Sequence, residues 1–367
     1  MPSLTTDLPR VALSTEPSRF SAGEILPIRS QPLFNPNGDD RIESRQIWDG
    51  NPTGQIELNS VRYKWATKIY RTMRQNFWNP ERIDLTGDRA QFRQLTSDEQ
   101  SAYKGIISFL IFLDSVQVKN LPYIARSITA PEISICLAEQ TSQEALHAAS
   151  YQYCVESIFD ESDRHQIYNA WRTDKVLADR CQSISSLYQR YIDNPCPTTY
   201  LAALIGDYLL EGLYFYNGFN FFYVLASRQL MVDTSDMIRY INKDELTHRE
   251  LFQRLVVAAM ERYPHAIDKD QIYRMFRSAV TVELAWADRT IGDKILGMHP
   301  AATTAHTQYL ANNLLRAIGL DDLYPRISNP YAHLEKLDGS DTEVRGDFFE
   351  ANNTDYQHDV MVGWGDF

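Results

Sequence analysis

Apolar side chains recur at helical spacing along most of this sequence, and no other feature restricts the fold as strongly. The pattern predicts helices over about residues 58–77, from 96 through 113 and beyond, from 129 past 153, and over about 164–191, 199–229, 234–262, 269–296 and 302–318. Thr96 with Glu99 has the spacing of a capping box. Thr129 with Glu132 has the same spacing, and Pro131 fits a first helical turn. Because no segment between 100 and 320 alternates as strands do, we expect an all-α bundle of long helices.

The two ends of the chain lack this period. Residues 1–50 are rich in Pro, Ser, Arg and Asp and are expected to form an extended N-terminal arm. Residues 51–335 are expected to form one helical domain. Residues 336–367 are polar and acidic with scattered aromatic residues, a composition typical of a flexible tail that becomes ordered on a partner.

The net charge excludes one class of partner. The chain of 367 residues has 36 Lys and Arg against 48 Asp and Glu, a formal charge of −12. Binding to nucleic acid or to anionic lipid needs a basic face, so we expect neither partner. The four cysteines form no C-x-x-C pair, and the N-terminus lacks the pattern of a signal peptide. We therefore expect a protein of the reduced cytoplasm.

One apolar stretch has the length of a membrane span, residues 201–226. It contains polar side chains that are costly in lipid: Asp207, Glu211, Asn217 and Asn220. The stretch is therefore expected to be a buried helix, with no association with a membrane.

Two of the eight histidines follow a glutamate by three residues, in Glu144-x-x-His147 and Glu245-x-x-His248. On a helix this spacing places a carboxylate oxygen and an imidazole nitrogen on one face, where both can bind one metal ion. Either pair alone is a weak signal, because an ordinary surface charge pair has the same spacing.

Two further acids lie inside strongly apolar runs, Asp114 in ISFLIFLDSVQV and Glu211 in YLLEGLYFY. An unpaired carboxylate buried there would cost several kcal/mol. A salt bridge or a helix end would also explain them, but no Lys or Arg lies within four residues before either acid. Metal ligation is the more economical explanation. Asp207, one turn before Glu211, is a rival for its place.

Together these residues supply one carboxylate from each of two helices and a carboxylate with a histidine from each of two more. This is the ligand set of ferritin-like di-iron and di-manganese proteins. Oxygen and imidazole ligands in this number suit iron or manganese and argue against a structural zinc site. We expect a ferritin-like helical bundle with a buried dinuclear metal site.

At this point the sequence resembles the small, radical-generating subunit of class I ribonucleotide reductase. The resemblance covers about residues 32–320, through NFWNPERIDLTGD, FLDS, EALHAASY, LLEGLYFY and KDELTH, in the order and spacing of that family. It implies that Asp114, Glu144 and His147 bind one metal ion. It implies that Glu211, Glu245 and His248 bind the other, with Glu144 and Glu245 bridging.

The resemblance also implies a radical site. The radical-bearing tyrosine of the family follows the first histidine by four residues and is here Tyr151, on the same helical stripe as Glu144 and His147. Without the resemblance it is one core tyrosine among 21. Three residues match the apolar pocket around that tyrosine: Phe215, Phe219 and Ile241.

The implied reaction has two stages. The reduced dimetal centre reacts with oxygen or a reduced oxygen species and oxidises Tyr151, and the radical then passes to a cysteine of a separate large subunit, where ribonucleotides become deoxyribonucleotides for DNA synthesis. Trp78 and Asp244, the latter as hydrogen-bond partner of His147, resemble the start of that transfer path. Trp78 as a plain core aromatic residue is an equally good interpretation.

The tail resembles the segment by which the family docks on the large subunit. Tyr356 matches the tail tyrosine that hands the radical across, Glu350 stands near it, and Trp364 and Phe367 match the docking end. The resemblance further implies a homodimer and a reductant or activase as additional partners. Di-iron is favoured for the centre, with dimanganese as the alternative, since the ligand sets are nearly shared.

Two other functions would also fit the metal-ligand pattern. A related dimetal ligand-binding oxidase keeps the metal site without a reductase partner, but it needs no docking tail of the kind that Tyr356 and its aromatic neighbours indicate. A metal-storage or purely structural helical protein would need no Tyr151 pocket, and storage proteins are usually short chains that form cages.

Overall fold

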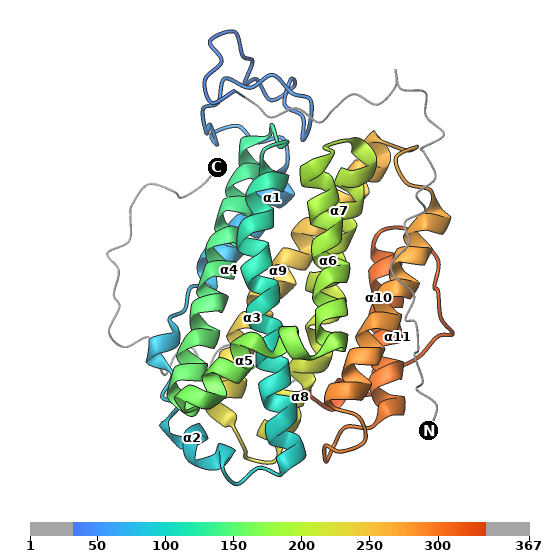
Figure 1. The fold of residues 1–367 in the computed structure, drawn as a ribbon. Helices are drawn as coiled ribbons and strands as arrows, with labels where there is room; N and C mark the ends of the chain where they lie inside the picture. The colour runs from blue at the N-terminus through green and yellow to red at the C-terminus, as the bar shows by residue number, and fades with distance from the viewer. Residues whose placement is uncertain (1–31, 335–367) are drawn as a thin grey trace.

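The computed structural model describes residues 32–334, and within that range it contains helices and no strand, as the sequence predicts. The long helices run side by side in a bundle (Figure 1). The α-helices are α1 Lys64–Gln75, α2 Thr86–Phe92, α3 Ser97–Ala125, α4 Pro131–Ile158, α5 Glu161–Thr173, α6 Lys175–Asp193, α7 Pro197–Leu209, α8 Tyr216–Ser227, α9 Val232–Arg262, α10 Lys269–Thr290 and α11 Pro300–Ala317. Short 3₁₀ turns are η1 Pro80–Arg82 and η3 Ala332–Leu334, and η2 Leu210–Tyr214 is a π-helical turn.

The centre of the bundle is formed by four segments, α3, α4, η2 and α9. Helix α4 packs against α3 and α9, and α9 packs in turn against α7 and α8. Helix α6 covers α3 and α7, while α10 and α11 lie together on the far side of α6 and η2 (Figure 1). This arrangement places the middle of α3, α4, η2 and α9 around one common interior.

A side-chain capping box was predicted at the start of two helices, and the structure contains one of them. Thr96 caps α3 in the predicted capping box, because its hydroxyl accepts from the Glu99 amide at 3.2 Å and the Glu99 carboxylate accepts from the Thr96 amide at 2.9 Å. The box predicted at Thr129 and Glu132 is wrong. The hydroxyl of Thr129 donates to the Gln46 carbonyl at 2.6 Å, and α4 begins at Pro131 without a side-chain cap.

Two predicted helices also have wrong boundaries. The helix predicted at 58–77 is shorter, since α1 begins at Lys64, and the helix predicted at 164–191 is two helices. The break falls at Asp174, whose carboxylate accepts from the amides of Val176 at 2.9 Å and Leu177 at 3.1 Å. An N-cap of this kind starts a new helix regardless of the apolar period on either side. Helix α2 was not predicted.

The membrane-length stretch is interior, as expected. All residues from 200 to 226 are buried except Tyr216. Among the described residues one helix, α3, is long and apolar enough to cross a membrane by length and composition alone, and more than half of its most apolar stretch is buried inside the fold.

Residues 32–63 contain turns but no helix or strand, and they lie against the end of the bundle where α3 ends and α7 begins (Figure 1). The Trp48 indole donates to the Tyr200 hydroxyl at 3.0 Å, and Arg45 pairs with Glu132 at 3.4 Å. The domain boundaries at residues 50 and 335 stay predictions.

Candidate metal centre

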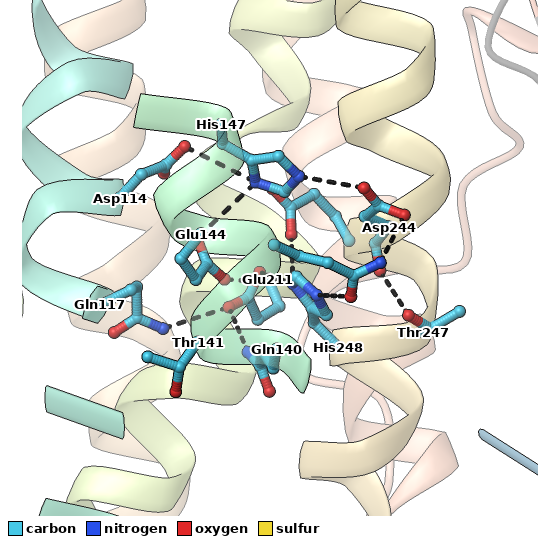
Figure 2. A network of polar contacts seen from close by, with 12 residues as sticks. Asp114, Gln117, Gln140, Thr141, Glu144, His147, Glu211, Asp244, Thr247 and His248 are labelled. Carbon is cyan, nitrogen blue, oxygen red and sulfur yellow. Dashed lines mark hydrogen bonds and ion pairs between the residues drawn. The ribbon is translucent and has the colours of Figure 1, made fainter. Parts of the chain in front are cut away.

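Six acidic and imidazole side chains from four segments meet in the interior of the bundle. Asp114 comes from α3, Glu144 and His147 from α4, Glu211 from η2, and Glu245 and His248 from α9. Their ligand atoms form two groups, each with all atoms within 4.8 Å of one another: Asp114, Glu144, His147 and Glu245, and Glu144, Glu211, Glu245 and His248. All six side chains are fully buried, and Figure 2 shows the labelled members pointing toward one another.

Two carboxylates belong to both groups and divide their oxygens between the histidines. Glu245 places one oxygen 3.2 Å from Nδ1 of His147 and the other 2.7 Å from Nδ1 of His248. Glu144 does the same at 3.7 and 3.1 Å. Asp114 lies only on the His147 side, at 3.8 Å, and Glu211 only on the His248 side, at 3.9 Å. Glu144 and Glu245 therefore face both positions, whereas Asp114 and Glu211 each face one.

The inward atoms of this cluster fit a pair of cations. Hydrogen-bond partners within the described residues are missing for both oxygens of Asp114 and of Glu144, for one oxygen each of Glu211 and Glu245, and for Nδ1 of His147. Leaving so many buried polar atoms unpaired would cost several kcal/mol. Because four carboxylates carry four negative charges, two divalent ions would neutralise the cluster and complete its bonds.

Without cations, burial and the charges of the cluster shift the pKa values of its members. Burial, reinforced by neighbouring carboxylates, raises the pKa of Asp114 and of Glu211 well above the usual range. Burial acts in the same direction on Glu245, but His147 and His248 outweigh it and lower the pKa of this carboxylate. Burial disfavours a charged imidazole, yet the adjacent Glu245 raises the pKa of both histidines. Without metal ions, protons on these groups would balance part of the charge, and metal binding would have to displace them.

Hydrogen bonds outside the cluster fix the orientation of both imidazole rings. Nε2 of His147 lies 3.2 Å from Oδ2 of Asp244, and Nε2 of His248 lies 3.0 Å from Oε1 of Gln143. A carboxylate and an amide oxygen only accept, so Nε2 of each ring donates and Nδ1 faces the cluster, where it could bind a metal ion once it carries no proton. The Gln143 amide donates to the other oxygen of Asp244 at 2.9 Å, which couples the two rings.

Glu211, and not its rival Asp207, belongs to the cluster. One oxygen of Glu211 accepts from the amides of Gln117 at 3.1 Å and Gln140 at 3.2 Å, which leaves the other oxygen toward His248 (Figure 2). Asp207 is equally buried but turns to the amides of Gln117 and Asn120, at 2.8 and 3.1 Å. The amide residues and Gln143 were not predicted, because a Gln or Asn inside a helix has no distinguishing sequence pattern.

Tyr151 lies one turn beyond His147 on α4 and is fully buried. Its hydroxyl has no hydrogen-bond partner within residues 32–334. Burial, and then the nearby carboxylates of Asp114 and Glu245, raise its pKa well above the usual value. The predicted pocket residues Phe215, Phe219 and Ile241 are also fully buried, and the two phenylalanine rings stack at 5.6 Å.

Trp78 connects the centre to the edge of the bundle. Its indole nitrogen donates to Oδ2 of Asp244 at 2.9 Å, and its ring stacks near His147 at 6.4 Å. The ring also stacks on Tyr240, with centroids 5.3 Å apart and planes 13° from parallel. Tyr240 was not predicted. The predicted tail residues Glu350, Tyr356, Trp364 and Phe367 lie outside the described residues.

The fold and this cluster define the class of ferritin-like helical bundles whose interior carries carboxylate and histidine ligands for metal. Comparison with known proteins narrows the class further. The family model "Ribonucleotide reductase, small chain" matches residues 55–330, and the chain belongs to this family.

Three relatives illustrate the similarity. The ribonucleoside-diphosphate reductase subunit beta of Treponema pallidum is 36% identical over 335 residues, which cover 90% of this chain and 95% of that protein. The solved structure of the ribonucleotide reductase R2 subunit from Clostridium botulinum superimposes with a TM-score of 0.82 at 39% identity, covering 85% and 99% of the two chains. A dimanganese(II) structure, NrdF of Streptococcus sanguinis, superimposes with a TM-score of 0.65 at 19% identity, covering 78% and 99%, and shows the fold alone.

The chain is therefore the small subunit of an oxidoreductase that works with a separate large subunit. The sequence predictions of the family, the all-α ferritin-like fold and the enzyme class are confirmed. The roles of individual residues stay predictions.

Proposed function

We propose that this chain generates and stores the radical on which ribonucleotide reduction depends. Asp114, Glu144 and His147 would hold one metal ion, and Glu211, Glu245 and His248 the other. The pair of ions, when bound, supplies the oxidising power gained from oxygen or a reduced oxygen species. The observation that supports this proposal is the convergence of unpaired, fully buried ligand atoms from four segments, with the buried Tyr151 one turn after His147 on α4.

Asp114 would balance the charge at Tyr151, and the predicted pocket residues would protect the radical. A phenol that loses an electron also loses its proton, and among the charged groups that act on Tyr151 the Asp114 carboxylate has the strongest influence. An oxygen of Asp114 is our candidate to accept this proton. Phe215, Phe219 and Ile241 are fully buried and apolar, so they would exclude water and reductants from this part of the bundle.

The hydrogen-bonded path from His147 through Asp244 to Trp78 would carry the oxidising equivalent outward. Each link is a direct contact of 2.9 to 3.2 Å between buried groups. Tyr356 in the tail would then pass it to the large subunit, and Trp364 and Phe367 would dock there. A chain that ends at residue 334 tests this role: it should keep its metal and lose reductase activity, and retained activity would contradict it.

For the metal we propose iron, with manganese as the alternative, because both take carboxylate and imidazole ligands in this number. We also propose a homodimer. The outward face of α3 carries apolar side chains that the described residues cover only partly, Ile111, Phe112, Val116 and Val118. Light scattering of the purified chain should give about twice its 42.3 kDa mass, and a monomer would contradict the dimer.

Metal analysis tests the ligand set. The wild-type chain, purified without metal and titrated with Fe²⁺ or Mn²⁺ under anaerobic conditions, should bind about two ions per chain. Glu211→Gln should lower the affinity for the ion on the His248 side by about 10–100-fold or abolish its binding, because one carboxylate charge is lost. A Glu211→Gln variant that binds both ions as the wild type does would contradict the assignment.

Asp207→Asn is the matched control. Asp207 is as deeply buried as Glu211 and lies one turn away, but it contacts amides and stands outside the cluster. The substituted side chain keeps one oxygen that can accept from the amide of Gln117. This variant should therefore retain both metal ions, and its losing one of them would make Asp207 the ligand in place of Glu211.

A further inference from the structure

A second buried charge cluster lies on the side of η2 away from the metal ligands, between α6 and α10. Arg180 of α6 and Glu283 of α10 are both fully buried and form an ion pair. The guanidinium lies against two aromatic rings, with Cζ 3.3 Å from the centroid of Phe109 and 3.8 Å from that of Trp286, and the two rings also contact each other. Burial lowers the pKa of Arg180 to about 10 and raises that of Glu283 to about 7.

Such a pair needs an explanation other than stability. Taking two charges out of water costs about as much as their attraction returns, and apolar residues of the same size often stabilise a core equally well. Nε and Nη1 of Arg180 also have no hydrogen-bond partner within the described residues. A role in fixing one local conformation explains why a core would retain the pair.

The contacts of the pair point to that conformation. Nη2 of Arg180 donates to the backbone carbonyl of Tyr214 at 2.5 Å, and Tyr214 is the last residue of the π turn. A π turn inserts one residue into a helix and leaves a carbonyl without its usual i+4 amide. The guanidinium therefore stabilises the irregular turn at the point where the helical hydrogen-bond pattern changes.

The flanking residues are held as well. The side-chain amide of Asn217, in the first turn of α8, donates to Glu283 at 2.8 Å and to Thr307 of α11 at 3.0 Å. On another side of the turn, Gly212 approaches α11 so closely that an added Cβ would lie 2.5 Å from a methyl group of Leu314. The backbone that carries Glu211 is thus fixed from α6, α10 and α11.

We propose that Arg180, paired with Glu283, is a positioning residue that holds the π turn Leu210–Tyr214 in the register at which Glu211 faces the metal site. The same register sets the start of the segment with Phe215 and Phe219. The metal part of this inference rests on the proposed function, whereas the conformation of the turn does not.

The test is the double variant Arg180→Met/Glu283→Gln, which removes both charges and keeps an oxygen for Asn217. Two quantities are measured: Fe²⁺ or Mn²⁺ affinity, and amide hydrogen exchange of residues 208–219 in the metal-free chain. The metal ion on the His248 side should bind about 10–100-fold less tightly. The backbone amides of the turn should exchange about 10-fold faster or more. Unchanged metal affinity would overturn the proposal, with or without faster exchange.

The matched control is Arg45→Met/Glu132→Gln. This pair is also buried, but it lies at the end of the bundle, where Glu132 accepts from the amides of Arg62 and Tyr63. The control should keep both metal affinity and exchange of the turn at wild-type values. If the control lowered metal affinity as strongly as the test variant, the loss of any buried ion pair would be enough to weaken metal binding. The proposal would then fail.

A third variant, Arg180→Lys, keeps the proposal testable if the double variant does not fold. Arg180→Lys keeps a charge opposite Glu283 but lacks the planar fork that reaches Tyr214 at the same time. If the double variant does not fold, weaker metal binding and faster exchange in Arg180→Lys support the proposal, and wild-type values overturn it. A wild-type chain that binds no metal would contradict the proposed function, and the exchange of the turn would then decide the inference alone.

Discussion

Asp244 accepts three hydrogen bonds. The three donors are the Trp78 indole, Nε2 of His147 and the side-chain amide of Gln143. A group that only accepts sets the direction of every bond around it, so one buried carboxylate determines the tautomer of His147 directly. Through Gln143 it also determines that of His248. The two imidazole rings of the cluster are thus oriented by residues that lie outside it.

Trp78→Phe separates a transfer role from a packing role. Phenylalanine keeps an aromatic ring on Tyr240 and removes the indole donor to Asp244. The variant should still bind about two metal ions, since His147 and Gln143 still bond to Asp244. Reductase activity with the large subunit should fall by at least about 100-fold, roughly 2.7 kcal/mol in the barrier. Activity within a few-fold of the wild type would show that Trp78 is a packing residue only.

His306 gives a pH dependence that is independent of the metal. Burial lowers its pKa from 6.5 to about 4, and its Nδ1 accepts from the Asn220 amide at 3.2 Å. A proton on Nδ1 would face that donor. Because the unfolded chain binds this proton near pH 6.5 and the folded chain only near pH 4, stability is lost as pH falls through this range.

His306→Gln keeps an acceptor for Asn220 and removes the titration. Relative to the variant, the wild type should lose about 3 kcal/mol of unfolding free energy between about pH 7 and about pH 4. Urea denaturation of both proteins at several pH values measures this difference. Parallel pH profiles for the two proteins would contradict it.

At the scale of elements, the helical period predicted where helices lie but not where they break. The apolar repeat continues across Asp174, so the split between α5 and α6 depends on a side-chain cap that competes locally with the period. The π turn within 199–229 had no sequence signal, because its register is set by Arg180 and Leu314 on other helices. Contacts from distant segments decide such features, and a local pattern cannot contain them.

The metal cluster was predictable for a different reason. Acids inside apolar helices and Glu-x-x-His pairs are locally anomalous, so Asp114 and Glu211 stand out before any fold is known. Gln117, Gln140 and Gln143 are ordinary helix residues whose importance arises from a neighbouring helix. The candidate ligands were therefore visible in the sequence. Of the residues that orient them only Asp244 was predicted, through the family resemblance.

Asp174→Ala tests the helix break. The substitution removes the acceptor for the Val176 and Leu177 amides and should destabilise the folded chain by about 1 kcal/mol. Asp179→Ala, which removes an exposed partner of Lys175 on the same helix, should change stability by less than about 0.5 kcal/mol. Equal effects of the two variants in denaturant titrations would contradict the capping role.

At the scale of the whole molecule, the bundle isolates one chemical centre from water. Four segments far apart in sequence each supply ligands at mid-length, and α6, α10 and α11 cover the segment η2 from outside. The large apolar interior that a long all-α chain can build is what allows four carboxylates to be held without solvent. The family assignment and this architecture agree on a ribonucleotide reductase small subunit, for which we propose that the product is an oxidising equivalent.

Electron paramagnetic resonance of the metal-loaded, oxygen-exposed chain tests that claim most directly. The wild type should show a tyrosyl radical signal, and Tyr151→Phe should lose it while keeping both metal ions. Tyr103→Phe, at another fully buried tyrosine that bonds to Cys154 and Thr234, should retain the signal. A radical signal that persists unchanged in Tyr151→Phe would contradict the account.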